Sequence, residues 1–419
     1  MADIATGALA AEQIISTGLE AGVAYSIGRP TMPLLASFTQ IASTSDSISS
    51  SSLNRSHHTL TVVGDKAYIF GGLTSQGKLA DNNIHSIALS TASNDTPEYQ
   101  VLPAISQHKD GGVPAPRSKH SACALNGCVA IYGGCDEMGD TMNEGANIWL
   151  YDVEKISWSI LEPGGHQERI PLTRSDGCLL SHGGNLIIVG GKDSNNAPLS
   201  DVWHFNCFTR TWNQLPHMPN VATNAAISGD TLYVISSSDT LSSEVHHIDI
   251  KLFAEIPPSW ETVPFPTNPL VPGPRPRVRC GLVPITTGLG RNYLLYFFGD
   301  RQNATENDDL PQWNDLWTFQ LPSSNPDVKA TTKITEAFKP AKIKDQIREK
   351  LGVGSGHYNW AEVELQPPGD LKVFGGKVHP GPRSSFGYDV TADGRSVVLW
   401  GGSDAKGESH CDGWMIRLS

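Results

Sequence analysis

Arginine recurs along this 419-residue chain at a regular distance before paired glycines, and converging guanidinium groups could bind an anion. A guanidinium group presents its donors as a planar fork that can hold a carboxylate through two hydrogen bonds. The first three arginines each lie 16 residues before a Gly-Gly doublet, and an asparagine takes the fourth place at the same spacing. The candidate ligand-binding residues are therefore Arg55, Arg117, Arg174, Asn220, Arg277 and Arg383.

Other chemistry has little support in the residue pattern. The pairs His57-His58 and His246-His247 are adjacent, so in a strand their side chains point to opposite faces and do not share one ion. The seven cysteines form no CxxC pair, and no G-x-S-x-G elbow, P-loop or Rossmann fingerprint occurs. We expect no metal site and no cofactor.

An internal repeat in the sequence indicates which secondary-structure elements position the arginines. Six apolar runs end in Gly-Gly or a degenerate doublet, and each follows one of the six arginine or asparagine positions. The runs are 67–70, 128–132, 186–189, 232–235, 293–298 and 397–400. The matched spacing predicts a hairpin of two short strands repeated around the molecule.

Two further segments complete each repeat. The third segment of the repeat, after the two strands of the hairpin, carries a tryptophan, as in Asp201-Val-Trp203, or a histidine in its place. The fourth segment carries one aromatic residue such as Trp158. Four strands with alternating apolar positions, repeated six times, predict an all-β, six-bladed propeller. The last repeat stops after its third strand, so Leu35–Ile41 is expected to close the ring as the N-terminal strand.

These arginine-headed strands, Gly-Gly doublets and Trp-bearing outer strands resemble kelch repeats over residues 33–419, with departures from the glycine pattern in blades four and five. In a propeller, the loops that enter the first strand and those that join strands two and three open on one face, which we call the top. The arginines head the innermost strands, so we expect them to ring the mouth of the central channel there. The resemblance implies that they contact acidic residues of a partner. The alternative is structural: each arginine bonds carbonyl groups of the neighbouring blade.

Two long loops are expected on the top face, 135–146 and 300–314. Long loops on a rigid scaffold are where recognition usually resides. They add Asp136 and Arg301 to the candidate ligand-binding residues.

Two segments fall outside the repeat. Residues 1–30 have a helical pattern, and the propeller proper is assigned to 31–419 with an insert at 329–352 in blade five. The insert also has helical spacing, with Pro340 starting or kinking its helix. We expect both helices to pack together on the bottom face, which leaves the top open.

Charge and composition limit the classes of partner that the protein can be expected to bind. The net charge of −12 argues against a nucleic-acid binder, which needs a basic footprint. No apolar run is long enough to cross a bilayer, and no secretory signal is evident, so we expect a cytoplasmic protein without membrane contact and with reduced cysteines.

Two functions from different classes fit these expectations. The first is a stand-alone propeller that binds an acidic peptide, a protein or an anionic small molecule at the arginine-lined mouth. The second is a cofactor-independent enzyme of specialised metabolism, a cyclase, isomerase or lyase, whose arginines stabilise developing negative charge. The shape of the mouth discriminates them, because an enclosed pocket favours a small ligand.

Overall fold

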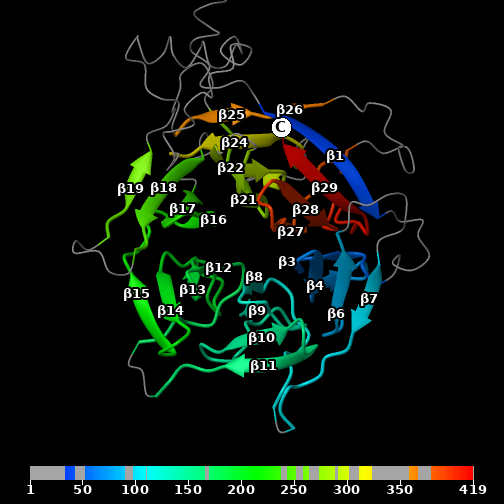
Figure 1. Cartoon of the computed structure of the whole chain (residues 1–419), viewed down its shortest axis with the longest axis vertical. Coiled ribbons are helices and arrows are strands. Elements are labelled where there is room, and N and C mark those ends of the chain that lie inside the picture. The colour runs from blue at the N-terminus through cyan, green and yellow to red at the C-terminus, as the bar shows by residue number, and fades with distance from the viewer. Residues whose placement is uncertain are drawn as a thin grey trace, which may run out of the picture.

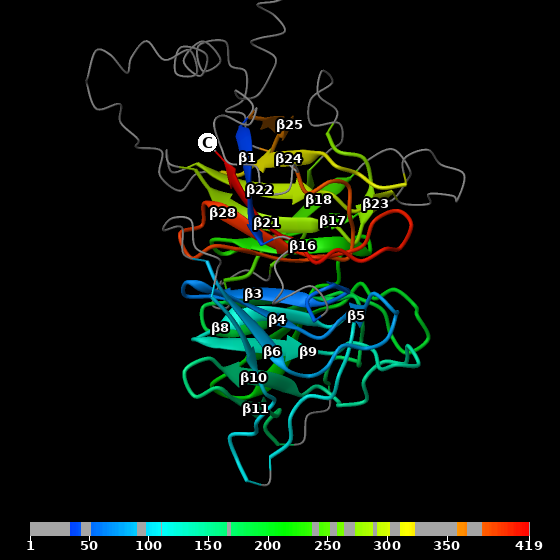
Figure 2. The same ribbon diagram turned by 90° about the vertical axis from the view of Figure 1, so that its right-hand side faces the viewer.

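The structure is a computed structural model that describes residues 34–42, 52–89, 98–109, 111–165, 169–236, 243–251, 258–263, 273–287, 291–301, 311–322, 358–366 and 379–418. Every regular element in these ranges is a β-strand. Figure 1 shows the sheets arranged around a central axis, and Figure 2 shows the same molecule from the side. The predicted six-bladed propeller is confirmed. The expected helices at 1–30 and 329–352 lie outside the described residues.

Blades one to three each contain four antiparallel strands, taken from consecutive parts of the chain. Blade one is β3 (Thr59–Val63), β4 (Lys66–Phe70), β6 (Ile84–Ala88) and β7 (Tyr99–Leu102). Blade two is β8 (Ser121–Leu125), β9 (Cys128–Tyr132), β10 (Ile148–Asp152) and β11 (Ser157–Leu161). Blade three is β12 (Cys178–His182), β13 (Asn185–Val189), β14 (Val202–Asn206) and β15 (Thr211–Leu215).

Blades four to six continue the same order around the ring. Blade four is β16 (Ala222–Ser228), β17 (Thr231–Ser236), β18 (Glu244–Asp249) and β19 (Glu261–Val263). Blade five is β21 (Gly281–Thr286), β22 (Asn292–Phe297), β24 (Leu316–Gln320) and β25 (Trp360–Glu362). Blade six is β27 (Gly387–Val390), β28 (Ser396–Trp400), β29 (Gly413–Leu418) and β1 (Leu35–Ala42).

Strand β1 closes the ring as predicted. It runs antiparallel to β29, with Phe38 opposite Ile416 and Ala36 opposite Leu418. Its other edge pairs in parallel with β26 (Glu364–Leu365), which follows blade five in the chain. The outer edge of blade six is therefore covered at this point, and an exposed strand edge, which would favour aggregation, is avoided.

The core is divided into layers between neighbouring blades. Each second strand is buried on both faces: in β4 the four residues Ala67 to Phe70 are all buried. The apolar clusters join blade one to two, two to three, three to four, four to five, five to six, and six back to one. Because every blade buries apolar surface against two neighbours, the hydrophobic effect holds the innermost strands around a fixed channel.

Candidate functional site

The five predicted arginines are buried and bound to carboxylates of their own blades. Each is at most 2% exposed. In blade three, Nη1 and Nη2 of Arg174 donate to the two carboxylate oxygens of Asp201 at 2.7 and 2.9 Å, and Nη1 also donates to the carbonyl oxygen of Gly190 at 2.8 Å. The same two-bond contact between guanidinium and carboxylate, here called an arginine fork, joins Arg117 to Glu144, Arg277 to Asp315 and Arg383 to Asp412. In blade one a single hydrogen bond joins Arg55 to Asp81.

The tryptophan of the third strand donates to the same carboxylate. The indole nitrogen of Trp203 lies 2.7 Å from Asp201, and Trp317 and Trp414 contact Asp315 and Asp412 in the same way. Sequence reasoning missed this arrangement, although its signal was visible as an aspartate two residues before the tryptophan in three repeats. Burial tends to raise the pKa of Asp201, but the Arg174 contacts outweigh it and lower the pKa below its usual range.

This arrangement gives the arginines a structural role. Their donors are directed at a carboxylate and at a carbonyl group of the Gly-Gly segment, which fixes the loop that enters each blade. The prediction that these guanidinium groups contact a ligand stays a prediction, but the ligand would have to displace a carboxylate of the same blade, which is buried in the case of Asp201 and Asp412. Breaking such a buried pair by removing one partner costs about 3–5 kcal/mol.

The remaining predicted residues are also held within the fold. Asn220 donates from Nδ2 to Glu244 at 3.1 Å, so blade four keeps the carboxylate but lacks the cation. Oδ1 of Asp136 accepts hydrogen bonds from the backbone of Met138 and Asp140, which shapes its loop. The guanidinium group of Arg301 lies 4.1 Å from the centre of the Trp313 ring, a cation–π contact.

A different set of residues surrounds the top mouth, two positions after each arginine. These residues have left-handed backbone conformations with φ of 53–55°. We name them the top ring: His57, Lys119, Asp176, Arg279 and Ser385. Left-handed backbone in residues other than glycine is uncommon and often marks a functional site.

Backbone hydrogen bonds link the top ring from blade to blade. The amide of Asp176 donates to the carbonyl of Lys119, Lys119 to His57, His57 to Ser385, and Ser385 to Arg279, at 2.8–3.2 Å. Among the described residues, blade four supplies no member of this series. The backbone positions from which these side chains project are therefore held relative to one another, with a break at the blade that lacks the arginine.

The top ring carries mixed charge. The Arg279 side chain is 53% exposed and contacts Asp300 at 2.6 Å, and Asp176 contacts Lys192 at 3.3 Å. Among the described residues no carboxylate pairs with Lys119. Burial and the nearby cation of Arg279 lower the pKa of His57 to about 4, so its imidazole is neutral at neutral pH.

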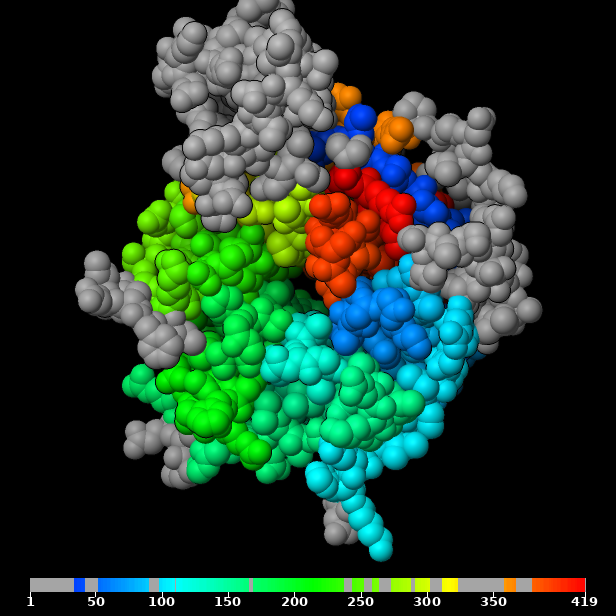
Figure 3. Space-filling model, in the orientation of Figure 1, coloured from blue at the N-terminus to red at the C-terminus, as the bar shows by residue number. Residues whose placement is uncertain are grey.

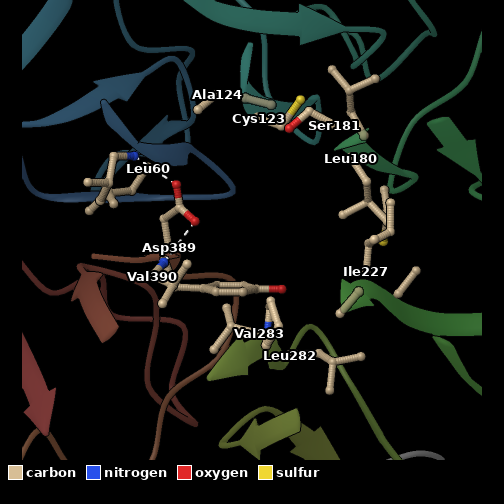
Figure 4. A pocket seen from close by; sticks show the side chains of 18 of the residues that line it. Leu60, Cys123, Ala124, Leu180, Ser181, Ile227, Leu282, Val283, Asp389 and Val390 are labelled. Atoms are coloured by element: carbon tan, nitrogen blue, oxygen red, sulfur yellow. Dashed lines mark hydrogen bonds between the residues drawn. The ribbon is translucent and has the colours of Figure 1, made fainter. Parts of the chain in front are cut away.

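Below the top ring lies a cavity of about 760 Å³ in the central channel. Innermost strands of all six blades line it (Figure 4). Its lining begins one residue inside the ring, at His58, His120 and Phe386, and reaches the bottom turns at Gly229 and Gly394. The space-filling view in Figure 3 has a hollow at this central position. The cavity volume lies in the range of small-molecule pockets.

The described part of the chain contains neither a metal site nor, along the cavity wall, a reactive thiol. No group of three histidine, cysteine or acidic residues there could hold a metal ion. Cys123 and Cys178 line the cavity, but burial raises the pKa of Cys178 to about 11 and that of Cys123 further, so both thiols are protonated and weakly nucleophilic. Within the described residues, no helix is both long and apolar enough to span a bilayer.

Comparison with known families agrees with the repeat. The family model described as "KLHDC2/KLHL20/DRC7 Kelch-repeats domain" matches residues 57–283, more than half of the chain. A solved structure titled "Structure of YjhT" superposes with a TM-score of 0.55 at 13% identity, covering 87% of this chain and 97% of that one. At this identity the likeness concerns the fold alone.

Curated relatives are distant. Acyl-CoA-binding domain-containing protein 4 of Arabidopsis thaliana is 24% identical over 82% of this chain and 50% of its own length. Kelch domain-containing protein 3 of Rattus norvegicus is 25% identical over 39% of this chain and 40% of its own. The chain spans about half the length of the Arabidopsis relatives it matches.

Proposed function

Since the chain belongs to the kelch-repeat family, we propose that it binds a polypeptide partner across its top face, through the top ring and the surrounding loops. The observation that carries this proposal is the hydrogen-bonded series of left-handed residues. It fixes the backbone of five residues around one mouth before any partner arrives, and preorganisation of this kind reduces the entropy lost on binding.

The partner segment is proposed to be acidic. Lys119 and Arg279 are the cations of the top ring, in blades two and five, and separate carboxylates of the partner could approach them. This assigns the expected anion recognition to residues two positions after the buried arginines. The adjoining loop between β9 and β10 presents Met138, which is 85% exposed and could make an apolar contact at the edge of the interface.

The proposal is tested by selecting peptides from a random library on the full chain and measuring the affinity of selected peptides. We expect acidic sequences to be enriched. Lys119→Ala combined with Arg279→Ala should weaken their binding by about tenfold or more, which corresponds to about 1.4 kcal/mol. The matched control is Lys155→Ala combined with Lys251→Ala, which removes two exposed lysines on the bottom face.

Two outcomes would contradict the proposal. One is a selection that enriches no peptide above background. The other is a set of peptides whose affinity is unchanged by the Lys119 and Arg279 substitutions, or is reduced equally by the control. Circular dichroism of the variants would show that both pairs of substitutions leave the fold intact.

The enzyme alternative stays a hypothesis, and the cavity volume of about 760 Å³ is the observation that favours it. A small molecule retained by the purified protein in native mass spectrometry, together with its conversion, would support this function. Its proposed electrophilic groups were the five arginines, and these are bound to carboxylates. A catalyst of this type would therefore have to use other residues of the cavity.

A further inference from the structure

The lower half of the channel contains a carboxylate for which the described residues supply no cationic partner. Asp389 lies on β27 and forms part of the cavity wall, beside Leu60 of blade one and Val390 (Figure 4). Its Oδ2 accepts a hydrogen bond from the amide of Val62 at 2.8 Å, and its Oδ1 accepts one from the amide of Val390 at 2.8 Å. An ionised carboxylate can accept about four hydrogen bonds. Acceptor capacity therefore remains on both oxygens.

Among the described residues of the cavity wall, no other is charged at neutral pH. The lining contains no lysine, arginine or glutamate, and Asp389 is its sole aspartate. The remaining titratable side chains of the lining are neutral, because burial raises the pKa values of the thiols and the phenol and lowers those of the imidazoles. They are Cys123, Cys178, Tyr388, His58 and His120. The cavity therefore contains one anion and no cation.

The surroundings of Asp389 disfavour its ionised form. Burial raises its pKa to about 6, and the two backbone hydrogen bonds oppose this only in part. Above that pH the carboxylate is ionised with two backbone hydrogen bonds and only partial exposure to the cavity, and incomplete solvation of a charge is costly. A cation entering the cavity would relieve this cost.

The rest of the wall selects the kind of cation. Aliphatic side chains dominate opposite Asp389, where Leu180 and Ile227 lie (Figure 4), and Leu282 and Val283 extend the same surface. An inorganic cation would need several oxygen ligands, and the described residues offer no cluster of three acidic, histidine or cysteine side chains. An organic ammonium group with an apolar body satisfies both the carboxylate and the aliphatic wall.

We propose that the central channel binds an organic ammonium cation, whose charged group pairs with Asp389 and whose apolar part packs against the aliphatic wall. Access is from the bottom turns, since the lining reaches Gly229, Thr286 and Gly394. The ammonium group belongs either to a free small amine or to a lysine side chain of a polypeptide. This site is separate from the top ring and does not depend on the function proposed for it.

The structural alternative is that Asp389 only joins blade six to blade one through Val62. A neutral acceptor such as asparagine could make that contact without a buried charge, so the contact alone does not account for a carboxylate in an otherwise uncharged cavity. The two roles differ in one measurable respect. Only the binding role makes the cavity prefer an amine over a neutral molecule of the same shape.

The test uses the full chain and three probes with the same cyclohexyl ring: cyclohexylamine, cyclohexanol of nearly the same shape, and the anion cyclohexanecarboxylate. Binding is measured by titration calorimetry. We expect the amine to bind about tenfold or more tightly than the alcohol, and the carboxylate not to bind. A lysine-containing peptide and its norleucine counterpart form a second arm, which distinguishes a polypeptide source from a free amine.

Substitutions locate the charge that is responsible. Asp389→Asn should reduce amine affinity to that of the alcohol, whereas Asp393→Asn, an exposed aspartate on the adjacent turn, should leave it unchanged. Lys119→Ala combined with Arg279→Ala should also have no effect, which separates this site from the top ring. Equal binding of amine and alcohol, or amine binding that survives Asp389→Asn, would overturn the proposal.

A measurement on the unmodified protein covers the case in which Asp389→Asn fails to fold. The carboxyl carbon of Asp389 is followed by nuclear magnetic resonance as a function of pH, with and without saturating cyclohexylamine. Pairing with the ammonium group should lower the apparent pKa of Asp389, by about one unit for tenfold coupling. An unchanged pKa at saturation would show that the amine does not pair with this carboxylate.

Discussion

The side-chain amide of Asn224 in blade four donates to the hydroxyl oxygen of Tyr388 in blade six across 3.2 Å, so two blades that are not neighbours are joined through the channel. The same Nδ2 donates to the backbone carbonyl of Cys280 in blade five at 2.8 Å. One polar side chain therefore links three consecutive blades. Blade four lacks the arginine found in the other blades, and Asn224 gives it a different connection to the ring.

Removing this connection should reduce stability in two steps. Tyr388→Phe deletes the hydroxyl contacts with Asn224 but leaves the Cys280 contact, and we expect a loss of about 0.5–1.5 kcal/mol in the free energy of unfolding. Asn224→Ala also leaves the Cys280 carbonyl without its donor, and should cost about 1–3 kcal/mol. Urea unfolding measures both. Equal effects of the two substitutions would mean that the contact with Cys280 contributes nothing.

We predict that replacing an arginine of these arginine–carboxylate pairs lowers the stability of the fold. Arg174→Met leaves the Asp201 carboxylate buried without its cation and should cost about 3–5 kcal/mol, while Arg174→Met combined with Asp201→Asn should recover part of that loss. Lys155→Ala, which removes one side of an exposed pair with Asp152, serves as the comparison and should have little effect. If Arg174→Met lost partner binding without losing stability, a direct ligand role for this arginine would be favoured instead.

Two glycines near the ends of β4 allow two contributions to the stability cost of a glycine-to-alanine substitution to be separated: the backbone conformation and the crowding of the added Cβ atom. Gly64 and Gly71 have nearly the same φ, +65° and +61°. A Cβ atom at Gly64 would meet nothing within 4 Å, whereas at Gly71 it would lie 2.4 Å from the carbonyl oxygen of Arg117 in the next blade. Gly64→Ala should cost about 1–2 kcal/mol from its left-handed conformation alone.

Gly71→Ala adds a clash with backbone to the same conformational cost, and thermal unfolding should show a loss at least twice that of Gly64→Ala. The clash would be relieved only by moving two blades apart. Similar losses for the two variants would indicate that the interface between blades one and two can shift without cost.

Asp389 should make stability depend on pH. Its pKa is about 6 in the folded chain and about 3.9 when unfolded, so the folded state binds the proton more tightly. Its stabilising contribution is therefore complete below about pH 4 and is lost as the pH rises to about 6.

The measurable quantity is the difference in unfolding free energy between the unmodified chain and Asp389→Asn. It should fall by up to about 3 kcal/mol between about pH 4 and pH 6, and should be constant above about pH 7. A difference that does not vary with pH would mean that the carboxylate is well solvated. Saturating cyclohexylamine should reverse part of the fall, because the ammonium group stabilises the ionised form.

The sequence by itself determined the architecture. The spacing from Arg117 to its glycine doublet, and the tryptophans of the third strands, follow from backbone geometry that repeats in every blade. The closing strand was predictable for the same reason, because a blade that ends at its third strand requires a fourth from elsewhere, and Phe38 has the matching pattern. Local periodicity carries this information, since strands and hairpins are set by neighbouring residues.

The site was decided only by the tertiary structure. An arginine before a Gly-Gly doublet has the same sequence signal whether it faces a channel or binds Asp201, which lies 27 residues further on. The half-buried position of Lys119 and the surroundings of Asp389 depend on which side chains the other blades place beside them. These are properties of contacts between distant segments, and the charge and burial of a group depend on all of its neighbours, so no single repeat contains them.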